Sequence, residues 1–297
     1  MSSTRSLTLI AGPTASGKSR RALEMADATG AVIVNADSQQ LYADLRILTA
    51  RPSRDEEMRV PHHLYGVADA AEAWSVGRWT RAVMPLLERF RAEGRPVLIV
   101  GGTGLYFSAL TRGLADIPEV PAAARDEATA LFDTEGETAF RLRLATFDPP
   151  AEATIEAGDR QRLTRAYAVA RATGRSLSDW KASTRPLLAP GSYDRLVIEP
   201  EREALYAACD ARVDWMLAHG AVEEVRALAA RGLDSALPVM KAVGVRELTG
   251  HLAGDTTRAE ATAAMKKATR NYAKRQLTWF RNQCGGWART QPTTGQS

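Results

Sequence analysis

The chain has 297 residues, of which 45% are hydrophobic and 25% charged, an ordinary balance for a globular enzyme with a sizeable core. The first residues lack the pattern of a signal peptide, and no stretch reaches the roughly 18 apolar residues that span a bilayer, so we expect a cytoplasmic protein without membrane contact. Cys209 and Cys284 stand far apart in the sequence, which argues against a disulfide framework or a structural zinc site and favours two free thiols.

Short apolar runs and helical spacings alternate over the first part of the chain. Residues 6–12 have the pattern of a buried strand, and residues 18–30 have helical spacing that ends at a glycine. Val- and Ile-rich runs at 31–37 and 96–102 predict parallel strands, with an amphipathic helix within 74–94 between them. This order predicts an α/β core with a parallel sheet through about residue 112.

The character of the sequence changes from 118 to 193, where charged helical segments follow one another and no strand-like run occurs. We therefore expect an inserted all-helical domain there, and a core formed by residues 1–117 and 194–297.

The remaining part of the chain returns to the pattern of the core. Residues 194–200 predict a strand that rejoins the first sheet, followed by long helices at 201–230 and 257–282. The polar tail from 289 to 297 is expected to fray.

A phosphate-binding motif occupies the turn between the first strand and the first helix. Gly12, Gly17, Lys18 and Ser19 match G-x-x-x-x-G-K-[ST], in which backbone N–H groups and the helix N-terminus face an anion, lysine adds a charge and the hydroxyl can bind Mg²⁺. The alternative, a glycine-rich helix start without a ligand, is disfavoured by the position between strand and helix.

Two further turns follow predicted strands. Asp37 lies just past one strand end, at the edge where open α/β sheets bind ligands; it could equally cap the next helix. Gly101, Gly102 and Gly104 surround Thr103 after another strand, and we expect them to form a second wall of the same crevice, although glycine is common in such turns.

The distribution of charge adds a separate prediction. The net charge is only +4, but no acidic residue follows Glu260, whereas that segment contains the cations Lys266, Lys267, Arg270, Lys274, Arg275, Arg281 and Arg289. Cations at 267, 270, 274 and 281 share one face of the predicted helix, and Tyr272, Gln276 and Trp279 lie along another. This pattern suits an RNA whose unpaired bases stack on aromatic rings, although an ordinary helix packed on the core also explains the aromatic residues.

Six segments in this order resemble the tRNA dimethylallyltransferase (tRNA isopentenyltransferase) family, bacterial type, from Leu7 to Arg281: GPTASGKS, NADSQQLY, PHHL, GGTGLYFSAL, QRLTRAYAV and KRQLTWFR. The resemblance implies a P-loop NTPase-like core with an inserted helical domain that contacts tRNA. It also implies transfer of a dimethylallyl group from dimethylallyl diphosphate to N6 of the adenosine 3′ to the anticodon, with Mg²⁺ as cofactor. We expect a monomer.

The resemblance also assigns site residues by position. Asp37 would accept the N6 proton, Lys18 and Arg246 would stabilise the leaving diphosphate, and Ser19 would bind the metal. The diphosphate-binding set is Gly12, Pro13, Thr14, Ala15, Ser16, Gly17, Lys18 and Ser19. The tRNA-binding set is Asp37, Ser38, Gln39, Gln40, Thr103, Arg125, Gln161, Arg162, Leu163, Thr164, Arg165, Lys274, Arg275 and Arg281.

The chain departs from the family pattern at three positions. Arg51 stands where the family commonly has lysine, so a planar fork replaces a flexible amine. Gly66 replaces a common aspartate, and Val245 replaces an aromatic residue.

Rival interpretations are an adenylate dimethylallyltransferase acting on free nucleotides, a P-loop kinase, and an RNA-binding module without activity. The long basic segment disfavours the first, the missing metal-binding aspartate disfavours the second, and the intact motif with Asp37 disfavours the third.

Overall fold

The computed structural model describes residues 6–292, which form two compact units. One unit contains the described residues up to Ala109 and from Leu188 onward, and the other is Leu110–Leu187. The predicted insertion, 118–193, is shifted relative to this second unit. The first and last residues of this unit already pair, because the N–H of Leu187 donates to the carbonyl of Leu110 at 3.0 Å.

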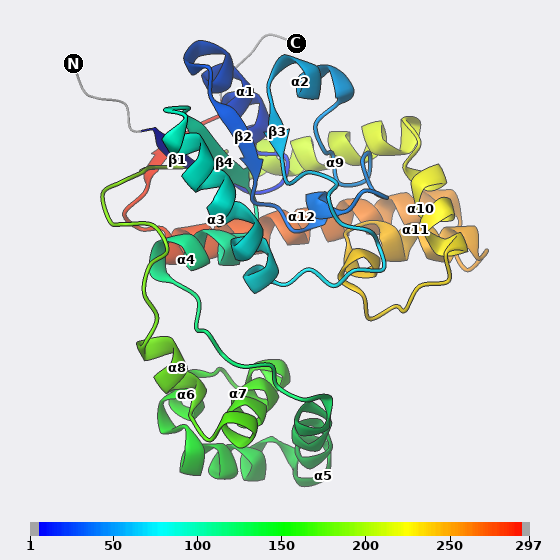
Figure 1. Cartoon of the computed structure of the whole chain (residues 1–297). Coiled ribbons are helices and arrows are strands. Elements are labelled where there is room, and N and C mark those ends of the chain that lie inside the picture. The colour runs from blue at the N-terminus through cyan, green and yellow to red at the C-terminus, as the bar shows by residue number, and fades with distance from the viewer. Residues whose placement is uncertain (1–5, 293–297) are drawn as a thin grey trace. The chain divides into compact units, whose positions relative to one another are not determined.

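The first unit is built on a six-stranded sheet with the order β3-β2-β4-β1-β5-β6, in which all pairs of strands are parallel (Figure 1). Its strands are β1 (Leu7–Ala11), β2 (Val32–Asn35), β3 (His62–His63), β4 (Val97–Gly101), β5 (Asp194–Ile198) and β6 (Ala288–Thr290). The predicted α/β class is confirmed, and so is the return of the strand after the insertion, because β5 pairs with β1.

The C-terminal tail corrects one expectation. Arg289 and Thr290 belong to strand β6, which pairs with β5, so this part of the tail does not fray. All three side chains of β6 are exposed, so no apolar run marked the strand. The end of the predicted tail, 293–297, lies outside the described residues.

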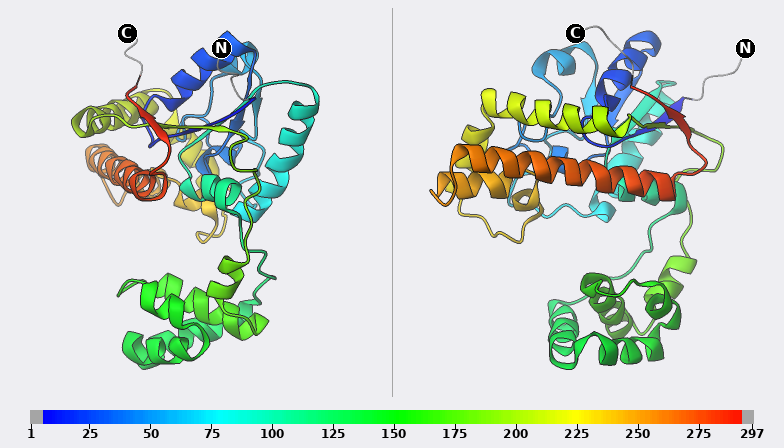
Figure 2. Two further views of the ribbon diagram at one scale, coloured as in Figure 1. Left: turned by 90° about the vertical axis from the view of Figure 1, so that its left-hand side faces the viewer. Right: turned by 180° about the vertical axis from the view of Figure 1, so that it is seen from behind.

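Helices cover the sheet and extend beyond it (Figure 1, Figure 2). The helices of this unit are α1 (Lys18–Thr29), α2 (Arg54–Arg59), α3 (Val76–Ala92), α4 (Gly104–Arg112), α9 (Arg202–Ala218), α10 (Ala221–Ala230), α11 (Val245–Leu252) and α12 (Arg258–Gln283), with 3-10 turns η1 (Gln39–Leu41) and η2 (Pro238–Lys241). The single helix predicted over 201–230 is wrong, because Gly220 has a φ of 107° and separates α9 from α10.

Helices α9 and α12 lie side by side (Figure 1, Figure 2). Their contact is apolar and includes Cys209 of α9 with Ala273 and Leu277 of α12, and Ala15 of the phosphate-binding loop packs against it. Both cysteines are free and buried, as expected. This packing brings the polar side chains of two distant helices to the loop after β1.

The second unit consists of α5 (Ala122–Phe147), α6 (Pro149–Thr154), α7 (Arg160–Thr173) and α8 (Leu177–Ala182). Phe140 and Leu144 of α5 pack with Leu163 and Tyr167 of α7 in its core. Within residues 6–292, no helix is both long enough and apolar enough to cross a membrane.

Candidate functional site

The loop from Gly12 to Gly17 has the conformation that an anion site needs. Gly17 precedes α1 with a φ of 79°, a conformation open to glycine and costly for other residues. A Cβ on Gly12 would lie 2.7 Å from the Ser16 hydroxyl, so the tight turn needs glycine here too. The first N–H groups of α1 are thereby left at the mouth of the loop, where the positive end of the helix favours an anion.

Lys18 is buried in this loop, and its ammonium group donates to the carbonyl of Pro13 at 3.1 Å. Burial removes the ammonium group from water and lowers the pKa of Lys18 to about 8, although the nearby Asp37 acts in the opposite direction. A bound anion would supply negative charge beside the ammonium group of Lys18 and so stabilise its protonated form.

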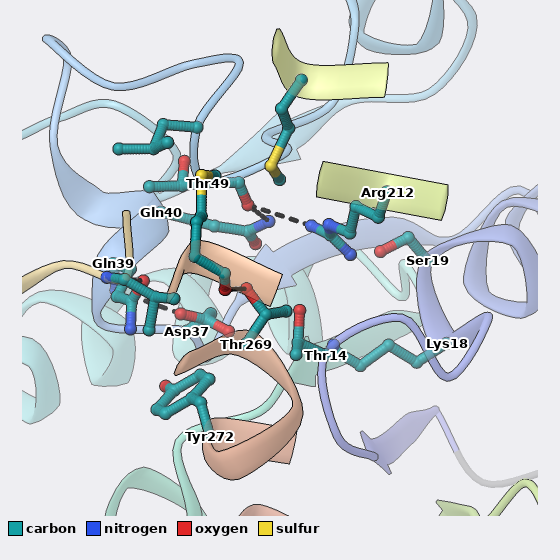
Figure 3. A pocket seen from close by; sticks show the side chains of 14 residues that line it. Thr14, Lys18, Ser19, Asp37, Gln39, Gln40, Thr49, Arg212, Thr269 and Tyr272 are labelled. Atoms are coloured by element: carbon teal, nitrogen blue, oxygen red, sulfur yellow. Dashed lines mark hydrogen bonds between the residues drawn. The ribbon is translucent and has the colours of Figure 1, made fainter. Parts of the chain in front are cut away.

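A pocket opens beside the loop, at the carboxyl ends of β1 and β2 (Figure 3), where open parallel sheets bind their ligands. Its lining combines the loop, the turn after β2, and helices from the C-terminal half: Thr14, Lys18, Ser19, Asp37, Gln39, Gln40, Leu48, Thr49, Arg212, Met216, Val243, Met265, Thr269 and Tyr272. Three of the eight predicted diphosphate residues, Thr14, Lys18 and Ser19, thus line one pocket together with Asp37.

Asp37 both stabilises a turn and lines the pocket. One oxygen, Oδ1, accepts the N–H of Gln39 at 3.0 Å, and the Asn35 amide oxygen accepts the N–H of Asp37 at 2.7 Å. No described residue donates a hydrogen bond to the other oxygen, Oδ2. The sequence offered a helix cap as the alternative role, but the N-cap of η1 is Ser38, without a side-chain cap hydrogen bond. Asp37 instead holds the turn before η1 and lines the pocket.

Gln276 of α12 joins the two glycine loops. Its side-chain oxygen accepts the N–H of Thr14 at 2.8 Å, and its Nε2 donates to the carbonyl of Gly102 at 2.9 Å. Thr103, beside this contact, accepts the N–H of Ser38 at 2.9 Å. The second glycine loop is thus tied to both the phosphate-binding loop and the turn after β2.

Arg212 of α9 is a pocket residue that the sequence did not indicate. Its Nη2 donates to the carbonyl of Thr49 at 3.2 Å, while its buried Nε has no partner among the described residues. Desolvation lowers the pKa of Arg212, and Asp37 opposes that effect. Lys18, which is buried, and Arg212, which is partly buried, therefore share the pocket with the carboxylate of Asp37.

Arg246 is not brought to this pocket. It lies exposed on α11 and is absent from the pocket lining, whereas its neighbour Val245 is buried. The arginine in the lining of this pocket is Arg212. Sequence proximity to a glycine turn could not show which arginine packs against the loop.

Many cations of the basic segment already have acidic partners. Lys266 pairs with Asp214 at 2.7 Å, and Arg270 pairs with Asp210 at 2.6 Å. Arg281 and Arg289 both pair with Glu199. The acids come from α9 and the end of β5, so the sequence of α12 alone overstated its free charge.

Among the exposed cations of α12, Arg281 is paired with Glu199, whereas Lys267, Lys274 and Arg275 have no salt bridge to a described residue. Trp279 and Tyr272, the aromatic residues of α12 that the sequence indicated, have different surroundings. The ring of Trp279 packs where a Cβ on Gly104 would lie, 2.3 Å from its nearest atom, so this ring serves packing. Tyr272 lines the pocket.

The helical unit has its own polar hollow. Four residues from the predicted tRNA-binding run on α7 line it with Arg125 of α5: Gln161, Arg162, Thr164 and Arg165. Partial burial and the nearby charge of Arg125 lower the pKa of Arg165, so two guanidinium groups repel each other there. Leu163 is a correction, because its side chain is fully buried in the helical core.

Two departures from the family pattern lie in contact. A Cβ on Gly66 would lie 2.2 Å from the guanidinium of Arg51, so the space that a side chain at 66 would need is filled by this arginine. Arg51 donates to the carbonyls of Tyr42 and Ala43 at 3.2 and 3.3 Å. It therefore supports the backbone of the loop that precedes it.

Comparison with known proteins gives a consistent assignment. Residues 40–283 match a family model described as IPP transferase, and residues 5–66 match one described as isopentenyl transferase. The tRNA dimethylallyltransferase of Phenylobacterium zucineum (strain HLK1) is 58% identical over 95% of this chain and 91% of its own length. The protein of the same name from Caulobacter sp. (strain K31) is 55% identical over 96% and 92%.

Solved structures agree with the fold. The crystal structure of a tRNA isopentenylpyrophosphate transferase from Bacillus halodurans has a TM-score of 0.70 and 31% identity, covering 98% of this chain and 91% of that one. A eukaryotic dimethylallyltransferase acting on tRNA has a TM-score of 0.83 and covers 98% and 75%; at 23% identity this likeness shows the fold alone. The chain therefore belongs to the IPP transferase family and is a transferase.

Proposed function

We propose that this chain transfers a dimethylallyl group from dimethylallyl diphosphate to N6 of the adenosine 3′ to the tRNA anticodon, releasing diphosphate. The observation that carries the proposal is one pocket in which a phosphate-binding loop, the cations of Lys18 and Arg212 and the carboxylate of Asp37 meet (Figure 3). The names and full-length similarity of the relatives supply the substrate class.

The diphosphate would lie on the loop from Gly12 to Ser19. Lys18, which is buried, and Arg212, which is partly buried, have no anionic salt-bridge partner among the described residues, and both line the pocket. As the bond between the allylic carbon and oxygen breaks, its electron pair passes to the diphosphate, whose added negative charge these cations stabilise. Arg212 thus takes the role that the resemblance assigned to Arg246.

Asp37 would act on the acceptor. N6 of adenine attacks the allylic carbon, and the proton that N6 loses passes to the carboxylate. Oδ1 is held by the N–H of Gln39, so Oδ2 is the oxygen available for this proton. A positioned base of this kind contributes about 10² to 10⁴ in rate.

The metal site fits Mg²⁺ only together with the substrate. Among the described residues no cluster of acidic, histidine or cysteine side chains could hold a metal. Ser19, exposed at the pocket, offers one hydroxyl, and Mg²⁺ commonly takes its other ligands from phosphate oxygens and water. When bound, Mg²⁺ would neutralise part of the diphosphate charge.

The tRNA would contact both units. Gln39 and Gln40 line the pocket, and the N–H of Ser38 donates to the hydroxyl of Thr103. These four residues would meet the target nucleotide, which must leave its stack to be modified. The hollow lined by Arg125 and α7 offers guanidinium groups to phosphates, and Lys274 and Arg275 add exposed charge. Arg281 would have to exchange its pairing with Glu199 to contribute.

We further propose that the enzyme is monomeric and, because its proposed substrate is a tRNA, cytoplasmic. The test is a competition between acceptors. The enzyme is incubated with radiolabelled dimethylallyl diphosphate, Mg²⁺, and equal concentrations of an anticodon stem-loop and AMP. We expect label almost only in the RNA; label mainly in AMP would replace the proposal with the free-nucleotide enzyme. A parallel reaction with γ-labelled ATP should transfer no phosphate, since transfer would indicate a kinase.

A further inference from the structure

One carboxylate holds the loop that precedes Arg51. Glu224 of α10 accepts the N–H of Arg46 at 2.9 Å, the N–H of Ile47 at 2.8 and 3.0 Å, and the N–H of Leu48 at 2.9 Å. Three consecutive N–H groups converging on one anion form a backbone nest, an arrangement that fixes the chain strongly because the acceptor is charged.

The residues after this nest form part of the pocket. The carbonyl of Thr49 accepts a hydrogen bond from Nε2 of Gln40 at 2.9 Å and one from Nη2 of Arg212 at 3.2 Å (Figure 3). The carbonyl of Ala50 also accepts from Nε2 of Gln40, at 2.7 Å. The backbone of this loop therefore determines where two pocket side chains lie.

The loop would not hold this shape without support. Ala50 has a φ of 46°, a left-handed conformation that residues with a Cβ adopt at a cost. The carbonyl of Thr49 is also the one hydrogen-bond acceptor that the described residues provide for the Arg212 guanidinium. A shift of the loop would thus break the one hydrogen bond that the described residues provide for Arg212.

We propose that Glu224 is a positioning residue for diphosphate binding: through the N–H groups of residues 46–48 it fixes the carbonyl of Thr49, which aims the guanidinium of Arg212 into the pocket. This inference rests on the proposed function of the pocket, in which Arg212 binds the diphosphate. Glu224 itself does not line the pocket and touches no reacting atom.

Glu224→Gln tests the inference with little change of shape. A glutamine has one oxygen acceptor, and its NH₂ group would face N–H donors that now bind the second carboxylate oxygen. The matched control is Glu223→Gln, because Glu223 is the adjacent residue of α10, is exposed, and pairs only with Arg226, at 3.7 Å, among the described residues. Both variants lose one negative charge from the same helix.

The measurement is the Kd of inorganic diphosphate with Mg²⁺, determined by titration calorimetry below the Tm of each variant. We expect Glu224→Gln to raise Kd about tenfold, the equivalent of one charge-assisted hydrogen bond, and Glu223→Gln to leave it within about twofold. The KM for dimethylallyl diphosphate should rise with Kd. An unchanged Kd in Glu224→Gln would overturn the inference.

Two further variants separate positioning from general stability. In an Arg212→Ala background, Glu224→Gln should no longer change Kd, because the group through which it acts is gone; an equal loss in both backgrounds would contradict the inference. If Glu224→Gln does not fold, Glu224→Asp, which keeps the charge on a shorter side chain, takes its place with the same expectations. Since diphosphate binding needs neither tRNA nor transfer, failure of the proposed function would leave this test readable: an enzyme that transfers no prenyl group can still show the loss of affinity.

Discussion

Replacing Gln276 by glutamate places a carboxylate at the junction of the two glycine loops. The side-chain oxygen can still accept the N–H of Thr14, but nothing remains to donate to the carbonyl of Gly102. Leaving that buried acceptor unpaired costs about 1–3 kcal/mol. We therefore expect a lower free energy of unfolding by about this amount.

The new charge has a second effect on Asp37. Nε2 of Gln276 and Oδ2 of Asp37 lie 2.3 and 3.1 Å from the same point, the position of a Cβ on Gly102, so the two carboxylates would lie within about 5 Å of each other. At that separation two unit charges repel by about 3 kcal/mol for an effective dielectric constant of 20. Since the proposed base must be ionised, the acid limb of the pH–rate profile should move to higher pH by up to about two units.

The assay is kcat/KM against pH, with thermal unfolding of the same samples. Gln283→Glu is the control, because Gln283 is exposed at the end of the same helix and the change adds the same charge; its profile should match that of the unmodified chain. An acid limb at its original pH in Gln276→Glu, with kcat/KM lowered less than twofold, would refute the proximity of Gln276 to a catalytic carboxylate.

Three more predictions concern the cations and the base. Because burial holds the pKa of Lys18 at about 8, the ammonium group is present below that pH and lost above it; the Kd of diphosphate should rise about fivefold from pH 8 to pH 9, and Lys18→Arg should flatten that dependence. Asp37→Ala should lower turnover by about 10² to 10⁴ in a single-turnover assay while tRNA affinity changes little; unchanged turnover would exclude Asp37 as the base. Neutralising Lys267, Lys274 and Arg275 together should reduce the slope of log Kd against log salt for tRNA by about two, and an unchanged slope would show that these residues do not bind RNA.

Much of the core could be predicted because its signals are local. The strands β1, β2, β4 and β5 are apolar runs bounded by glycine, asparagine or proline, and buried parallel strands require that pattern. Strand β3 has two residues and β6 has only exposed side chains, so neither carries a periodic signal. Their pairing depends on neighbours that a local sequence pattern does not show.

The residues of the site also differ in whether a local sequence signal predicts their position. The phosphate-binding loop and Asp37 follow strands directly, so their places at the sheet edge follow from the order of elements. Arg212 lines the pocket, whereas Gln276 and Glu224 hold the loops around it, and all three act through hydrogen bonds with residues more than 160 positions away in the chain. Each lies on a helix with mixed charges, where nothing in the local sequence distinguishes it from a solvent-exposed side chain.

The basic segment shows the limit of counting charges. The sequence identifies many cations, but Arg270 and Lys266 face Asp210 and Asp214 across the contact between α9 and α12. Only the packing of these helices reveals which cations are neutralised. The RNA-binding prediction for α12 consequently narrows to its exposed and unpaired positions.

The central claim is that the phosphate-binding loop serves cleavage of a carbon–oxygen bond and prenylation of an adenosine. The most direct measurement is mass spectrometry of nucleosides from unmodified tRNA after incubation with the enzyme, dimethylallyl diphosphate and Mg²⁺, with release of diphosphate measured in parallel. We predict one N6-dimethylallyladenosine for each diphosphate released, located 3′ to the anticodon. Diphosphate release without prenylated adenosine, or a prenyl group on another nucleotide, would contradict the account.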